Sequence, residues 1–88
     1  MLGAHGESQP ITEQVAALVT GLQEDVHAHM GTTYATFVPV SFTKQTVAGV
    51  NYRVKVQVGD DQHIQVVVFQ PLPHTGEPAS LTSVAPVA

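Results

Sequence analysis

The sequence predicts an α+β fold in which one long helix packs on an antiparallel sheet of four to five strands. Three observations indicate this arrangement. Apolar residues recur at helical spacing over residues 10–30, and from residue 34 onward the spacing changes to every second residue. Glycines and prolines then divide the alternating part into separate strands. Because such a helix has one apolar stripe, it needs a sheet face to cover that stripe.

The helix is expected to begin near Thr12 and to end before Gly31. A threonine hydroxyl can accept a hydrogen bond from a first-turn amide, and Glu13 follows where the helix dipole favours an acid. Gly31 suits the left-handed residue that terminates many helices. Gly21 weakens the helix interior by about 1 kcal/mol relative to alanine. The expected buried stripe consists of Ile11, Val15, Leu18, Leu22 and Val26.

Four segments have the composition of β-strands. Residues 34–43 are rich in β-branched and aromatic residues, and Pro39 within them indicates a bulge or an edge position. Residues 50–58 alternate, with three valines and one tyrosine on the face expected to be buried. A Gly-Asp-Asp turn leads to the return strand, residues 63–69. After a proline-rich loop, residues 81–87 form the last expected strand, which a proline near its end should terminate.

Composition narrows the classes of function. The chain has 88 residues, no cysteine, and seven acids against three bases, for a net charge of −4. Three bases are too few for a nucleic-acid surface, and the lack of cysteine excludes disulfides, thiolate metal sites and a cysteine nucleophile. No segment approaches the ~20 apolar residues that span a membrane, and no secretory signal is expected. We therefore expect one cytoplasmic domain, residues 1–88, with residues 1–9 as a flexible lead.

The connection between the first two strands carries the most informative motif. It reads Gln45-Thr46-Val47-Ala48-Gly49 and resembles the Gln-Val-Val-Ala-Gly loop of the cystatin superfamily, with Thr46 in place of the first valine. Neighbouring segments extend the resemblance: Val40-Ser41-Phe42, Asn51-Tyr52, Lys55-Val56, Val58-Gly59-Asp60, Val68-Phe69-Gln70 and Leu72-Pro73-His74. The last segment is similar to that of the stefins, the disulfide-free cytosolic branch. The resemblance covers nearly the whole chain and weakens after about Ser83.

The resemblance implies a reversible, tight-binding inhibitor of papain-like cysteine proteases, such as papain and the lysosomal cathepsins. Stefins block the active-site cleft with a wedge made of an N-terminal trunk and two hairpin loops. The protease-binding residues implied by position are Leu2 and Gly3 in the trunk, Gln45, Thr46, Val47, Ala48 and Gly49 in the first loop, and Leu72, Pro73 and His74 in the second. A narrow, rigid, apolar edge suits an apolar cleft, and occlusion needs no covalent step. No enzyme activity, metal or cofactor is implied.

Two other classes of function stay open. One is a cystatin-fold binding module, natural or engineered as a scaffold, whose loops contact a different protein partner. The other is a ligand carrier or enzyme on the same frame, which requires convergent titratable side chains. His27 and His29 are two residues apart and point in different directions on a helix, so they do not predict a metal site. The small apolar tip favours the inhibitor. The resemblance also implies an active monomer and an inactive dimer formed by strand exchange through the first loop.

Overall fold

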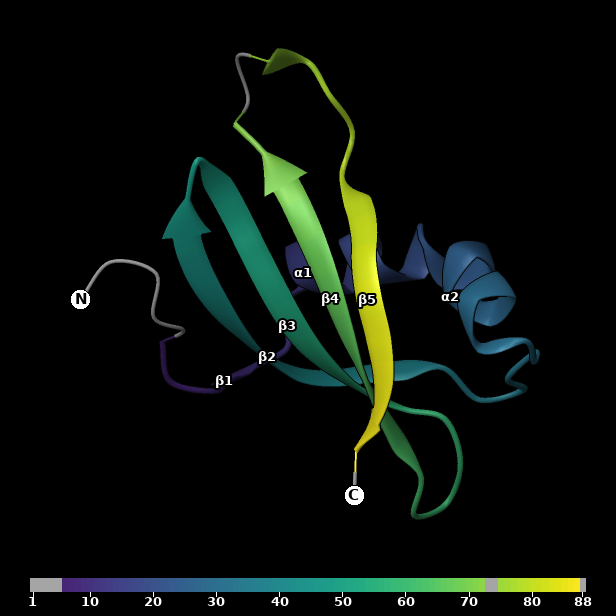
Figure 1. Ribbon diagram of the computed structural model, residues 1–88. Coiled ribbons are helices and arrows are strands. Elements are labelled where there is room, and N and C mark those ends of the chain that lie inside the picture. Colours follow the sequence, from purple (N-terminus) through teal and green to yellow (C-terminus); the bar gives the residue numbers. More distant parts are fainter. Residues whose placement is uncertain (1–5, 73–74, 88) are drawn as a thin grey trace.

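A five-stranded antiparallel sheet with helices behind it forms the protein (Figure 1), and the α+β prediction is confirmed. The computed structural model describes residues 6–72 and 75–87. Within them the strands lie in the sheet in chain order. The elements are β1 (Gln9–Pro10), α1 (Glu13–Thr20), α2 (Gln23–Met30), β2 (Val38–Val47), β3 (Gly49–Gln57), β4 (His63–Pro71) and β5 (Ser80–Val87). From β2 to β5 each strand pairs with the next one in the chain, so these connections are local and their turns lie at the two ends of the strands, whereas both helices separate β1 from β2.

The helical segment differs from the single long helix that the sequence predicts. It is divided into α1 and α2, because Gly21 has low helix propensity and Leu22 leaves helical geometry at φ −107° and ψ 12°. The Leu22 N–H donates to the Val19 carbonyl at 3.0 Å, a tighter turn than an α-helix makes. Both predicted ends are present. The Thr12 side chain accepts a hydrogen bond from the Val15 N–H at 3.3 Å, and Gly31 is left-handed at φ 71°.

The cap at Thr12 leads to a prediction about stability. Thr12→Ala removes the acceptor of the Val15 N–H, so we expect the free energy of unfolding to fall by about 1 kcal/mol. Urea unfolding followed by circular dichroism measures this loss. Thr20→Ala is the matched control, since Thr20 is an exposed threonine at the other end of α1 and its replacement should change stability by less than about 0.5 kcal/mol. Equal losses in the two variants would contradict the capping role.

The strands follow the predicted alternation, and they differ from it at their ends. β2 begins at Val38, four residues later than expected, and its register shifts between Pro39 and Ser41, which confirms the bulge expected at Pro39. β5 does not end before Pro86. The strand continues to Val87 with Pro86 opposite Ile64, because β5 is an edge strand and a proline can occupy an edge without breaking a central ladder.

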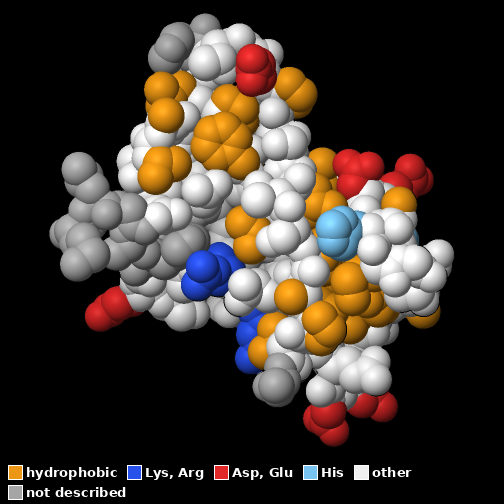
Figure 2. Space-filling view, viewed as in Figure 1, with side chains coloured by type: hydrophobic (Ala, Val, Ile, Leu, Met, Phe, Trp, Pro, Cys, Tyr) orange, Lys and Arg blue, Asp and Glu red, His pale blue; other side chains and the backbone are white. Residues whose placement is uncertain are grey.

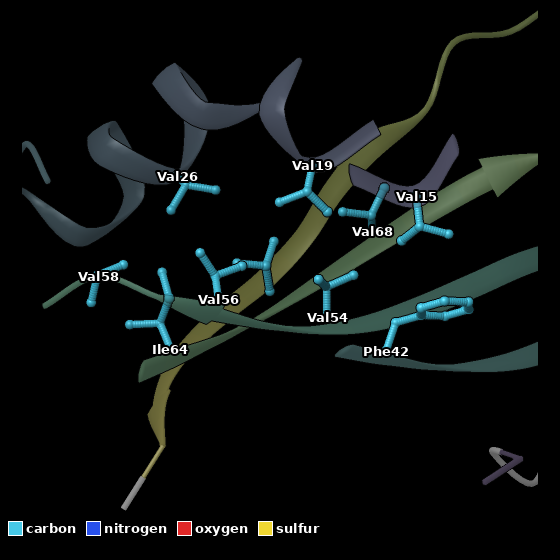
Figure 3. Packing of buried hydrophobic residues seen from close by; sticks show 10 residues of the cluster. Val15, Val19, Val26, Phe42, Val54, Val56, Val58, Ile64 and Val68 are labelled. Atoms are coloured by element: carbon cyan, nitrogen blue, oxygen red, sulfur yellow. The ribbon is translucent and has the colours of Figure 1, made fainter. Parts of the chain in front are cut away.

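The core lies between the helices and one face of the sheet (Figure 3). Val54, Val56 and Val58 are buried, as the alternation of β3 predicts, and Tyr52 is half-buried beside them. Among the described residues, the six largest fully buried side chains are all valines: Val19, Val26, Val54, Val56, Val66 and Val68. A uniform layer of short branched side chains lets the helices approach the sheet closely, so a methyl group lost here leaves a void.

The predicted helix stripe is wrong at one position, Leu18. Val15 and Val26 are buried as expected, and the half-buried Ile11 and Leu22 pack against the core. Val19, however, is 0% exposed and points from α1 toward Val68 (Figure 3), whereas Leu18 is half-buried and is not among the residues that pack against the core. The two residues are adjacent and therefore point about 100° apart on a helix. The sheet determines which of them is covered.

The N-terminal lead is tied to the sheet over part of its length. The Gly6 N–H donates to the Lys44 carbonyl at 2.9 Å, and Gln9 pairs with Phe42. Part of the lead therefore runs along the open edge of β2, which offers it hydrogen-bond partners, and its flexibility stays a prediction. Residues 1–5 lie outside the described residues. None of the helices in the described ranges is long and apolar enough to cross a membrane.

Candidate functional site

Two hairpin ends lie side by side at one end of the strands. The turn between β2 and β3 and the loop between β4 and β5 both leave the sheet at its upper end in Figure 1. The pairing of Gly49 with Pro71, and of Val50 with Gln70, sets the first end directly beside the start of the second. Hydrophobic side chains are exposed around this end of the molecule (Figure 2). The register of β3 and β4 therefore brings the two predicted loops together.

The predicted first loop is mostly strand. Gln45, Thr46 and Val47 continue β2 and pair with Asn51, Val50 and Gly49, so that Ala48 alone makes the turn. The Asn51 side-chain amide donates to the Gln45 side-chain oxygen at 3.4 Å across the stem of this hairpin. A motif held by backbone pairing up to its last residue keeps its shape better than a free loop.

The tip of this hairpin is small and exposed. Val47 is 46% exposed although it is a large hydrophobic residue, and Ala48 beside it is exposed as well. Thr46 is also exposed, so its hydroxyl faces water and avoids the desolvation that a buried, unpaired hydroxyl would suffer. The outcome is a narrow apolar edge whose one added polar group is solvated.

Gly49 is buried and has a backbone conformation that other residues avoid. Its φ is +134°, and an ideal Cβ at this position would lie 2.7 Å from the Gln70 carbonyl oxygen and 2.7 Å from Cζ of Phe69. Real Cβ atoms do not approach other atoms so closely. Glycine is required here both by backbone angle and by space.

The second loop begins at Leu72, whose side chain is 39% exposed. Its carbonyl accepts hydrogen bonds from the Thr75 N–H at 3.0 Å and from the Thr75 hydroxyl at 2.8 Å. Gly76 follows with a left-handed φ of 69°. Four predicted site residues lie outside the described residues: Leu2 and Gly3 in the trunk, and Pro73 and His74 in this loop.

Comparison with known proteins decides the family. The family described as "Cystatin domain" matches residues 24–84, which is more than half of the chain. The chain belongs to the cystatin family. It is 36% identical over 83 residues to Cystatin-B of Sus scrofa, covering 94% of this chain and 85% of that protein. Against Cystatin-B of Homo sapiens the identity is 35% over 83 residues, with the same coverage, and against Stefin-C of Bos taurus it is 34% over 82 residues, covering 93% of this chain and 81% of that protein.

These relatives confirm the stefin branch that the motifs indicate. Cystatins inhibit cysteine proteases and are not enzymes, so the family also confirms that this chain is not one. In the described ranges no group of three or more His, Cys, Asp or Glu side chains lies close enough to hold a metal ion. His27 has a structural contact instead: its Nε2 accepts a hydrogen bond from the Tyr34 N–H at 3.3 Å, and its ring packs edge-on against Tyr34 and Phe37.

The hairpin ends of this cystatin carry no charge among their described site residues, Gln45 to Gly49 and Leu72. A hollow on the helix side of the sheet touches both ends, since Gly49 and Leu72 line it together with Gln14, Tyr52 and Pro71. The described part of this edge therefore offers shape and apolar surface rather than titratable groups. It can fill a cleft.

Three further residues support the candidate site. Asn51 bonds to Gln45, and Phe69 and Gln70 close against Gly49 from the neighbouring strand. The sequence holds one signal for them. Both strands alternate regularly on either side of a short turn, so pairing outward from the turn at residues 59–61 places Gly49 opposite the end of β4.

Proposed function

We propose that this cystatin is a reversible, tight-binding inhibitor of papain-like cysteine proteases, including papain and the lysosomal cathepsins. The observation that carries the proposal is the double hairpin edge. Val47 and Leu72, each well exposed, project from two turns that the Gly49–Pro71 pairing holds side by side. An exposed pair of large apolar side chains at one edge is typical of a contact surface.

The inhibitor acts by occlusion. Val47, Ala48 and Gly49 are small enough to enter a narrow cleft, and the hairpin is already ordered before it binds, so little conformational entropy is lost. Leu72 adds a second apolar contact beside the first. Binding by occlusion forms no covalent bond, so the complex dissociates to intact inhibitor and active protease.

The finer parts of the wedge remain predictions. Leu2 and Gly3 would fill the cleft on one side of the first hairpin, and Pro73 and His74 would extend the second contact. The hydrogen bond from the Gly6 N–H to the Lys44 carbonyl supports this role of the trunk. Followed from Pro10 back to Gly6, the chain runs antiparallel to β2 and approaches its Val47 end. A cytoplasmic location, an active monomer and an inactive strand-exchanged dimer likewise remain predictions.

Titration of papain tests the function. Monomer isolated by size-exclusion chromatography is added to active-site-titrated papain, and residual cleavage of a fluorogenic peptide is measured. We expect complete inhibition near one inhibitor per enzyme, relieved on dilution. A flat titration at micromolar inhibitor would refute the proposal and would favour the second function, a cystatin-fold module with a different protein partner.

A matched pair of variants assigns the inhibition to the double hairpin edge. Leu72 and Val87 are equally exposed, 39% each, and lie near opposite ends of the sheet. We expect Leu72→Ala to raise the inhibition constant about tenfold, which corresponds to about 1.4 kcal/mol of lost apolar contact. Val87→Ala should leave the constant unchanged. Equal effects of the two changes would show that the protease contacts some other surface.

A further inference from the structure

Phe69 lies on the face of the sheet that the helices leave open. Its neighbours in β4, Val66 and Val68, are fully buried against the helices, so the alternation of the strand turns Val67 and Phe69 to the opposite face. Phe69 pairs with Asn51 of β3 and is half-buried. A large aromatic side chain outside the core and close to the hairpin end requires an explanation.

The ring closes against Gly49. An ideal Cβ on Gly49 would lie 2.7 Å from Cζ and 2.9 Å from Cε1 of Phe69, and 2.7 Å from the Gln70 carbonyl oxygen. Gly49 of β3 thus lies against the edge of an aromatic ring and a backbone carbonyl, both of which belong to β4. Its burial, one residue after the exposed Ala48, results from this contact.

Phe69 also belongs to the segment that leads into the second hairpin end. Only Gln70 and Pro71 separate it from Leu72, and Pro71 is itself buried and paired with Gly49. The first hairpin tip therefore packs against the same short stretch of β4 that leads into Leu72. The two apolar contacts of the edge share one support.

We propose that Phe69 is a positioning residue that sets the first hairpin tip against the second and so preorganises the edge for the protease. The proposal rests on the proposed function. The ring touches Gly49 rather than the protease, and it acts by limiting the conformations of residues 47–49. Loss of the ring leaves the tip free to move, so the bound conformation becomes a smaller fraction of the free ensemble.

Three variants test this role. Phe69→Ala removes the ring. Phe69→Leu keeps a large apolar side chain without adding an atom beyond Cζ, the ring atom that faces Gly49, and should rescue part of the effect. Val67→Ala is the matched control, because Val67 is a half-buried residue on the same face of the same strand, opposite Arg53 and away from the hairpin ends. Two readouts are used: the dissociation rate constant of the papain complex, and the amide hydrogen exchange of residues 47–49 in the free protein.

We expect Phe69→Ala to speed dissociation about tenfold, since differences among variants of one interface arise mostly in the dissociation rate. It should also speed amide exchange at residues 47–49. Phe69→Leu should lie between Phe69→Ala and the unchanged protein, and Val67→Ala should remain within about twofold of the unchanged protein in both readouts. An unchanged exchange rate at residues 47–49 in Phe69→Ala would overturn the proposal, as would equal acceleration of dissociation in Val67→Ala.

The exchange readout separates this proposal from the function on which it rests. If the unchanged protein fails to inhibit papain, the proposed function falls. The exchange of residues 47–49 in Phe69→Ala still decides whether the ring positions the tip. Inhibition by the unchanged protein, combined with dissociation from Phe69→Ala at the normal rate, would overturn the positioning role and leave the function standing.

Discussion

Replacing Gly49 with alanine is expected to weaken inhibition of papain about a hundredfold. The added Cβ would meet the Gln70 carbonyl oxygen and the Phe69 ring at 2.7 Å, and the φ of +134° is strained for any residue with a side chain. Strain and overpacking each cost about 1–3 kcal/mol. The hairpin tip avoids this cost by leaving its binding conformation. The protease must then restore that conformation, and about 3 kcal/mol corresponds to about a hundredfold in the inhibition constant.

Gly31→Ala is the control for this experiment. Gly31 also has a positive φ, 71°, but nothing lies within 4 Å of an added Cβ, and the residue caps α2 far along the chain from the hairpin tip. This variant should lose about 1 kcal/mol of stability, because left-handed backbone is costly for a residue with a Cβ, and it should keep its inhibition constant. Inhibition by Gly49→Ala at the normal constant would show that the edge binds without the geometry described for it.

The fold could be predicted wherever one local interaction decides the structure. Thr12 and Gly31 mark the helix ends because a hydroxyl acceptor and a left-handed glycine act within their own turns. The bulge at Pro39 follows from the covalent ring of a single residue. Pro86 shows the limit, since its tolerance depends on β5 lying at the sheet edge.

The candidate site could likewise be predicted only where local sequence decides its structure. The small apolar tip at Val47 and Ala48 can be read from the sequence, because composition alone makes it narrow and apolar. The support from Phe69 depends in addition on the register that places the end of β4 opposite Gly49, for which the turn at residues 59–61 is the one signal in the sequence. A shift of one residue in that register would turn Phe69 to the helix side, and the local sequence of either strand does not reveal the shift.

Val19→Ala is expected to lower the free energy of unfolding by about 2–3 kcal/mol and the melting temperature by about 10–20 °C. Val19 is fully buried above a layer of valines, and the short side chains around it leave little freedom to refill the lost volume. In a domain of 88 residues, where total stability is typically about 5–10 kcal/mol, this is a large fraction. Thermal unfolding followed by circular dichroism measures both quantities.

Leu18→Ala decides which helix face is covered. Leucine is the larger side chain, so if residue 18 faced the sheet, as helical spacing alone allows, its truncation would destabilise the protein more than that of Val19. In the structure Leu18 is half-buried and Val19 is 0% exposed, which predicts the opposite order and a loss below about 1.5 kcal/mol for Leu18→Ala. A larger loss at Leu18 would mean that α1 is turned by about 100° and that its buried stripe follows the sequence pattern after all.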